Sequence, residues 1–134
     1  MSGTDPQWAE ALRWVTKAGQ DRRSAVLMLG DDPPLLDPAA YHCQQAAEKL
    51  LKALLVAAGA AIPKSHDLQR LAALVEPLFP ALHAAVAPVT DLTPWATATR
   101  YPDLEGDLGV TAEDVREALA ALDTLHDAVM ALSS

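Results

Sequence analysis

Polar side chains recur at helical spacing between residues 41 and 52. Steps of three and four residues place them on one face of a helix. That face combines a phenol, an amide, a carboxylate and two ammonium groups: Tyr41, Gln45, Glu48, Lys49 and Lys52. Spacing alone leaves two interpretations. The face is either a solvated surface with incidental ion pairs, or a polar surface that lies in a groove or against a partner.

Cations and acids occur together in this sequence, and the combination allows two kinds of chemistry. Lys49, Lys52 and Arg100 could hold a phosphate group, because arginine can grip two oxygens at once and lysine adds a point charge. Asp21 and Glu48 could instead neutralise these cations in a buried network that fixes helix order or dimer register. Because acidic residues accompany the cations along the sequence, we favour the structural network.

The helix that must position these residues is predicted from Asp37 to Ala58. Asp37 offers a capping acceptor, and Pro38 suits the first helical position. Gly59 tolerates the left-handed conformation that often ends a helix. Apolar residues recur on the opposite face at the same spacing, at Cys43, Ala47, Leu50, Leu54 and Ala58. This stripe predicts packing against neighbouring helices.

Capping residues and prolines predict the remaining helices. Asp5-Pro6 begins the first helix, which ends near Gly30. Ser65 is the predicted cap of a helix that begins at His66. Thr111 begins the last helix, in a capping-box pattern with Asp114. The predicted ranges are 6–29, 66–76, 80–87, about 91–99 and 112–132.

Length and composition predict a single all-helical domain over residues 1–134. The chain is 51% apolar but contains only one phenylalanine and two tyrosines. A β-sandwich would require more aromatic and β-branched residues. Helical segments joined by short connections favour an antiparallel up-and-down bundle of four to five helices.

Charge and cysteine content exclude several classes of protein. The net charge of −8 opposes non-specific binding to phosphate backbones. A single cysteine excludes an internal disulfide, and Cys43 is predicted to lie in the core. No apolar segment is long enough to suggest a signal peptide or a membrane span. We therefore expect a soluble, cytoplasmic protein, and we predict no cofactor and no metal site.

Three separated motifs point to a family. They are Q-A-A-E-K-L-L-K at residues 45–52, S-H-D-L at 65–68 and R-Y-P-D at 100–103, and Asp21 precedes them. In this order and spacing the chain resembles the HEPN family, small helical domains named for their occurrence in higher eukaryotes and prokaryotes and for suspected nucleotide binding. The resemblance extends from about Trp14 to Leu132.

This resemblance implies a compact bundle, commonly a homodimer, with a row of polar residues in a cleft at or near the dimer interface. In bacteria, such domains act as partners of a minimal nucleotidyltransferase, often in toxin–antitoxin pairs. We name the predicted row the polar seam and expect it to bind a ligand or to form an ion network. Its ten residues are Asp21, Tyr41, Gln45, Glu48, Lys49, Lys52, His66, Asp67, Arg100 and Tyr101.

Many members of the family are metal-independent ribonucleases. Their signature is an arginine followed after four to six residues by a histidine, which acts as general base while the arginine steadies the phosphate. No arginine of this sequence is followed by histidine at that spacing. The leading hypothesis is therefore a non-catalytic, homodimeric module that binds nucleotide or RNA phosphate, a minimal nucleotidyltransferase, or both. The alternative is a ribonuclease toxin with a non-standard site, in which His66 is the base and Arg100 holds the phosphate.

Overall fold

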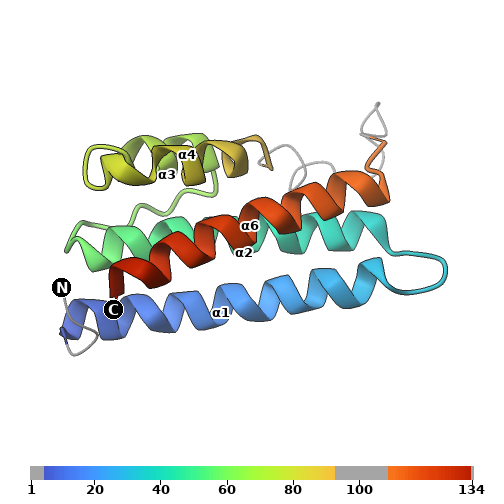
Figure 1. Ribbon diagram of the computed structural model, residues 1–134, viewed down its shortest axis with the longest axis horizontal. Helices are drawn as coiled ribbons and strands as arrows, with labels where there is room; N and C mark the ends of the chain where they lie inside the picture. The colour runs from blue at the N-terminus through green and yellow to red at the C-terminus, as the bar shows by residue number, and fades with distance from the viewer. Residues whose placement is uncertain (1–4, 93–108, 134) are drawn as a thin grey trace.

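The computed structural model describes residues 5–92 and 109–133, and all regular structure within these ranges is helical (Figure 1). This confirms the predicted helical bundle. The elements in chain order are α1 (Pro6–Leu29), α2 (Leu36–Ala57), α3 (Leu68–Val75), η1 (Pro80–Leu82), α4 (His83–Val86), η2 (Ala87–Leu92) and α6 (Ala112–Ser133), where η denotes a 3-10 helix.

Helix α2 lies at the centre of the molecule. It packs against α1, α3, η2 and α6. Helix α1 runs antiparallel to α2 and α6, which run in the same direction as each other, while α3 and α4 form a further layer over α2 (Figure 1). The start of α1 and the end of α6 lie at the same end of the bundle, opposite the turn between α1 and α2 (Figure 1).

The central position of α2 explains its composition. Its apolar stripe is removed from water: Cys43, Ala47 and Leu54 have no exposed surface, and Leu50 is also buried. Three polar residues of the same helix, Gln44, Glu48 and Lys52, are buried as well. Because neighbours cover α2 on most of its circumference, part of its polar face is interior rather than solvated.

Local chemistry sets several helix ends as predicted. Asp5 accepts a hydrogen bond from the Gln7 amide at 2.8 Å, ahead of Pro6. The capping box of α6 is confirmed, since Thr111 and Asp114 exchange two hydrogen bonds of 3.0 Å.

The end of α2 is also as predicted. Gly59 has a φ of 71°. Its amide donates to the Val56 carbonyl, and the Ala60 amide donates to the Leu55 carbonyl, which is the Schellman arrangement.

Two helix starts differ from the prediction. Helix α2 begins at Leu36 after Leu35, which makes no side-chain cap, so Asp37 lies within the first turn instead of capping it. Pro38 fits there because first-turn amides need no intrahelical acceptor.

Helix α3 begins at Leu68 with Asp67, not Ser65, as its cap. The Ser65 hydroxyl accepts the Asp67 amide at 3.1 Å. His66 is bound to α2 through its ring and its carbonyl, which holds this residue outside the helix.

The predicted helix over residues 80–87 is divided into η1, α4 and η2. Pro88 lacks an amide hydrogen and so cannot continue the bonding pattern of an α-helix beyond α4. The R-Y-P-D motif lies outside the described residues. The predicted helix over about 91–99 also lies outside them, except for its first two residues, which belong to η2. None of the helices in residues 5–92 and 109–133 is both long and apolar enough to span a bilayer.

Cys43 provides a test of the packing around α2. Its side chain has no exposed surface, and burial raises the pKa of the thiol to about 12, while the charge of Arg22 acts in the opposite direction. The pKa of this thiol is higher in the folded protein than its unfolded value of about 8.5. Burial of the neutral thiol therefore contributes its full stabilisation below about pH 8.5, and this contribution is lost as the pH rises toward the folded-state pKa.

We therefore expect the free energy of unfolding of the wild type to fall more steeply than that of Cys43→Ala between about pH 9 and about pH 11, by at most about 1.4 kcal/mol per pH unit. Denaturant titrations of both proteins across this range measure the difference. Parallel pH profiles would show that the thiol is not held neutral by the core.

Candidate functional site

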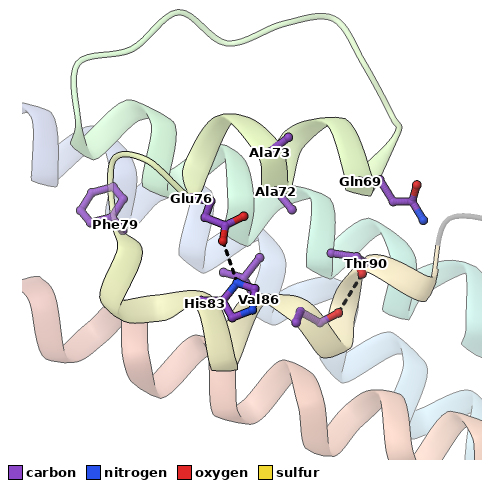
Figure 2. A pocket seen from close by; sticks show the side chains of 9 residues that line it. Gln69, Ala72, Ala73, Glu76, Phe79, His83, Val86 and Thr90 are labelled. Atoms are coloured by element: carbon purple, nitrogen blue, oxygen red, sulfur yellow. Dashed lines mark hydrogen bonds and ion pairs between the residues drawn. The ribbon is translucent and has the colours of Figure 1, made fainter.

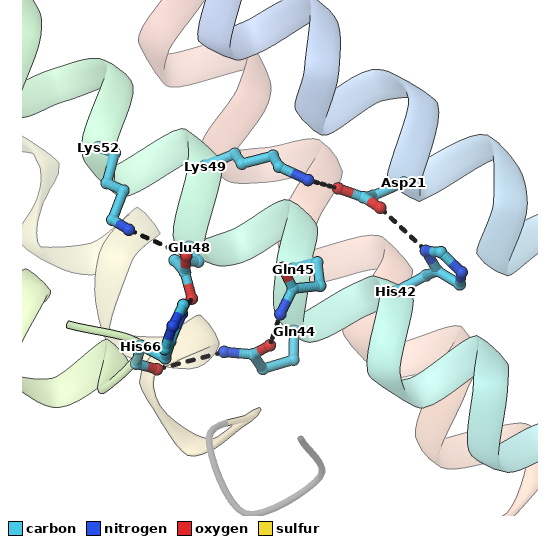
Figure 3. A network of polar contacts seen from close by, with 8 residues as sticks. All are labelled: Asp21, His42, Gln44, Gln45, Glu48, Lys49, Lys52 and His66. Atoms are coloured by element: carbon cyan, nitrogen blue, oxygen red, sulfur yellow. Dashed lines mark hydrogen bonds and ion pairs between the residues drawn. The ribbon is translucent and has the colours of Figure 1, made fainter. Parts of the chain in front are cut away.

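The polar side chains of α2 form two neighbouring clusters (Figure 3). The α2–α3 cluster contains Gln44, Glu48, Lys52 and His66, the last residue but one before α3. The α1–α2 cluster contains Asp21, His42 and Lys49. Gln45 joins the first cluster through its hydrogen bond to Gln44.

Glu48 is the central group of the α2–α3 cluster. Its Oε2 accepts from Lys52 Nζ at 3.0 Å, and its Oε1 lies 2.9 Å from His66 Nδ1. The Glu48 and Lys52 side chains are only 6% and 9% exposed, whereas the His66 ring is 64% exposed. One carboxylate thus joins a buried ammonium group to an imidazole at the surface.

Gln44 fixes the backbone at the same point. Its side chain is fully buried, and its Nε2 donates to the His66 carbonyl at 3.3 Å. Its Oε1 accepts from Gln45 Nε2 at 2.7 Å. His66 is therefore held by α2 twice, through its carbonyl and through its ring (Figure 3).

The contact with Glu48 determines which tautomer a neutral His66 adopts. A carboxylate that receives a lysine ammonium is ionised and can only accept hydrogen bonds, so His66 Nδ1 must carry the proton. In the neutral ring, Nε2 then carries the lone pair, and it makes no contact with Glu48. This arrangement can orient an imidazole as a general base.

The α1–α2 cluster depends on Asp21, whose side chain is 13% exposed. One of its oxygens lies 2.9 Å from His42 Nδ1, and the other accepts from Lys49 Nζ. The Lys49 side chain is 25% exposed, so this ammonium group is partly open to solvent. Tyr41 contacts the His42 ring edge-on, with the ring centres 5.6 Å apart.

Arg22, the residue after Asp21 on α1, forms an ion pair that lies outside both clusters. Arg22 Nε and Nη2 bind the two oxygens of Asp123 on α6, at 2.5 and 3.0 Å. This bidentate hydrogen bond raises the pKa of Arg22. Arg22 therefore ties α1 to α6, while the preceding Asp21 faces α2.

The structure brings together five residues of the predicted polar seam in these ion pairs: Glu48, Lys52 and His66 in one cluster, and Asp21 and Lys49 in the other. Gln45 and Tyr41 lie beside them. Asp67 instead caps α3, where it accepts from the amides of Gln69 and Arg70. Arg100 and Tyr101 lie outside the described residues.

Two members of the clusters were not predicted. Gln44 lies one turn before Glu48 on the same face, and His42 lies two turns before Lys49. Extending the helical spacing toward the start of α2 identifies both residues. Their surroundings were not visible in the sequence, because α1 and the residues before α3 supply the partners.

Both seam lysines in the described part of the chain already carry an ion pair. Residues 5–92 and 109–133 contain no group of three or more His, Cys, Asp or Glu side chains placed to hold a metal ion. The described part of the site consists of hydrogen-bonded ion pairs and one surface imidazole.

Fold and site together define a small helical domain whose central helix carries a partly buried polar face. The sequence model of the HEPN domain family matches residues 11–132. The chain belongs to the HEPN domain family. No curated protein and no solved structure matches it.

The burial of Glu48 leads to a stability prediction. Glu48→Ala would leave the Lys52 ammonium group buried without its carboxylate, and we expect a loss of about 3–5 kcal/mol in the free energy of unfolding. Glu10→Ala is the matched control, because Glu10 and Arg13 form an exposed pair on α1. That variant should lose less than about 1 kcal/mol. Denaturant melts measure both values.

A second variant separates the loss of pairing from the loss of packing. Replacing both partners, in Glu48→Leu combined with Lys52→Met, removes the stranded charge and should recover most of the lost stability. An unchanged melting midpoint for Glu48→Ala would contradict a buried ion network.

Proposed function

We propose that this chain is a non-catalytic HEPN module that works as a homodimer. In this proposal the polar face of α2 binds phosphate groups of a nucleotide or RNA, a minimal nucleotidyltransferase of the toxin–antitoxin type, or both. Membership of the HEPN family supports a nucleotide- or RNA-related module. The non-catalytic role is supported by the absence of the Arg–His ribonuclease signature from the sequence.

The observation that carries the proposal is that Lys49 and His66 reach solvent at the edge of the buried ion pairs. Lys52 is buried against Glu48, so its charge is used in an ion pair inside the domain. Lys49 is paired with Asp21 but reaches solvent, and His66 is more exposed still. A phosphate could approach these two groups from outside, although it must compete with Asp21 and Glu48. We therefore expect modest affinity that depends on salt.

Association with a second protein chain is supported by apolar surface at the turn between α1 and α2. Val26, Leu27 and Leu35 are 41%, 64% and 45% exposed. Large apolar side chains gathered at one end of a domain are typical of association surfaces. A partner that covers them would gain the hydrophobic contribution that the isolated chain leaves unused.

Calorimetric titration with ATP, GTP and short RNAs tests the ligand. We expect saturable binding to the wild type and at least a tenfold loss, about 1.4 kcal/mol or more, in the double variant Lys49→Ala, Arg100→Ala. Sedimentation equilibrium on the same samples measures the dimer. Arg116→Ala, which removes an exposed cation on α6, is the control. Equal binding by the double variant, or none by the wild type, would end the phosphate proposal.

A specific observation favours a second function. The Glu48–His66 contact presents an oriented imidazole at the surface, which a general base requires. The alternative is therefore a metal-independent ribonuclease in which His66 Nε2 takes the proton of the attacking 2′-hydroxyl. Arg100 would hold the phosphate in this reaction.

The ribonuclease alternative has a matched control within the chain. His83 is also bonded to a glutamate, Glu76, and its side chain is 66% exposed against 64% for His66. If the alternative holds, RNA cleavage in the presence of a chelator is lost in His66→Ala, by about a hundredfold or more, and kept in His83→Ala. Intact RNA after incubation with the wild-type protein would exclude it.

A further inference from the structure

A cavity lies between α3 and the segment formed by α4 and η2 (Figure 2). Its volume is about 270 Å³. This lies just below the range of about 300–1,000 Å³ typical of pockets for drug-sized ligands, so the cavity suits a smaller molecule. Ala72, Ala73, Val86 and Ala87 provide apolar walls, and Phe79 lies at one end.

The polar groups of the cavity are concentrated at two places. Glu76 and His83 face each other from α3 and α4, with Oε1 and Nδ1 2.9 Å apart. Gln69 and Thr90 lie toward the opposite end from Phe79 (Figure 2). Gln69 and Glu76 are seven positions apart in the sequence, which corresponds to about 10 Å along a helix. An elongated ligand could therefore meet a polar group at each end of an apolar body.

The charge of the cavity selects among ligands. None of the described residues that line it is a lysine or an arginine. A neutral His83 donates one hydrogen bond to Glu76 but leaves the carboxylate charge in place, and the second oxygen of Glu76 has no partner among the described residues. The net charge of the whole chain is −8. An anionic ligand is thus disfavoured, and a cation is attracted.

We infer that this cavity is a binding site for a small organic cation, a flat apolar ring system with a primary ammonium group. The ring lies over the alanines and Val86, and the ammonium group binds the free oxygen of Glu76. Gln69, whose side-chain amide has no hydrogen-bond partner among the described residues, offers both a donor and an acceptor to the far edge of the ring. This inference does not rest on the function proposed for the polar face of α2.

Three probes with the same indole ring and the same two-carbon arm test the inference: tryptamine, tryptophol and indole-3-propionate, which are cationic, neutral and anionic. Titrations followed by amide chemical shifts at about pH 8 give both the affinity and the location. We expect tryptamine to bind most tightly, about twofold to fivefold more tightly than tryptophol, as for an exposed ion pair. The shifts should map to α3 and α4.

Two variants and one control make the test specific. Glu76→Gln should abolish the preference for the cation while tryptophol binds as before. Ala73→Phe fills the cavity from an exposed helix position and should weaken all three probes. Glu10→Gln removes a carboxylate of similar exposure on α1, 54% against 56%, and should change nothing. Thermal melts verify that each variant is folded.

The inference is overturned by any of three results. They are no saturable binding of tryptamine, a preference for indole-3-propionate, or an unchanged preference for the cation in Glu76→Gln. Shifts that map to α2 would also overturn it, because they would assign the binding to the polar seam.

Discussion

The buried pairing of Glu48 with Lys52 is the constraint on which the arrangement of this domain depends. Two charges inside a helical bundle are tolerated only when they meet each other and their remaining hydrogen-bonding capacity is used. Glu48 satisfies this requirement by turning its second oxygen to His66. Because His66 lies two residues before α3, this contact ties the start of α3 to α2. A polar interaction thus organises an otherwise apolar core.

The position of α2 explains why such a pair is needed. A helix covered by α1, α3, η2 and α6 has little surface left for solvated side chains. Its polar residues must find partners within the fold or reach its edges. Gln44 and Glu48 find partners inside, while Lys49 reaches the edge beside α1. The same helix can therefore stabilise the bundle and present polar side chains at its edge.

The sequence predicted those features whose cause is local. Asp5, Gly59 and the Thr111–Asp114 capping box act within a few residues of their own backbone, so their roles can be recognised without a structure. Features set by tertiary contact could not be predicted in this way. His66, predicted to begin a helix, instead lies before α3 and contacts Glu48 across 18 residues of chain. Likewise, spacing showed a polar face on α2, but only the packing showed that Glu48 and Lys52 are interior.

The termini of the described fold have a practical consequence. The start of α1 and the end of α6 lie at one pole of the bundle, and these two helices are in contact. A short linker could join them, and the chain could be opened in the exposed segment around Ala61 and Ile62. Such a circular permutant would keep every helix and both polar clusters intact, while moving the new ends next to α3. Reporter groups attached there would lie on the connection between α2 and α3.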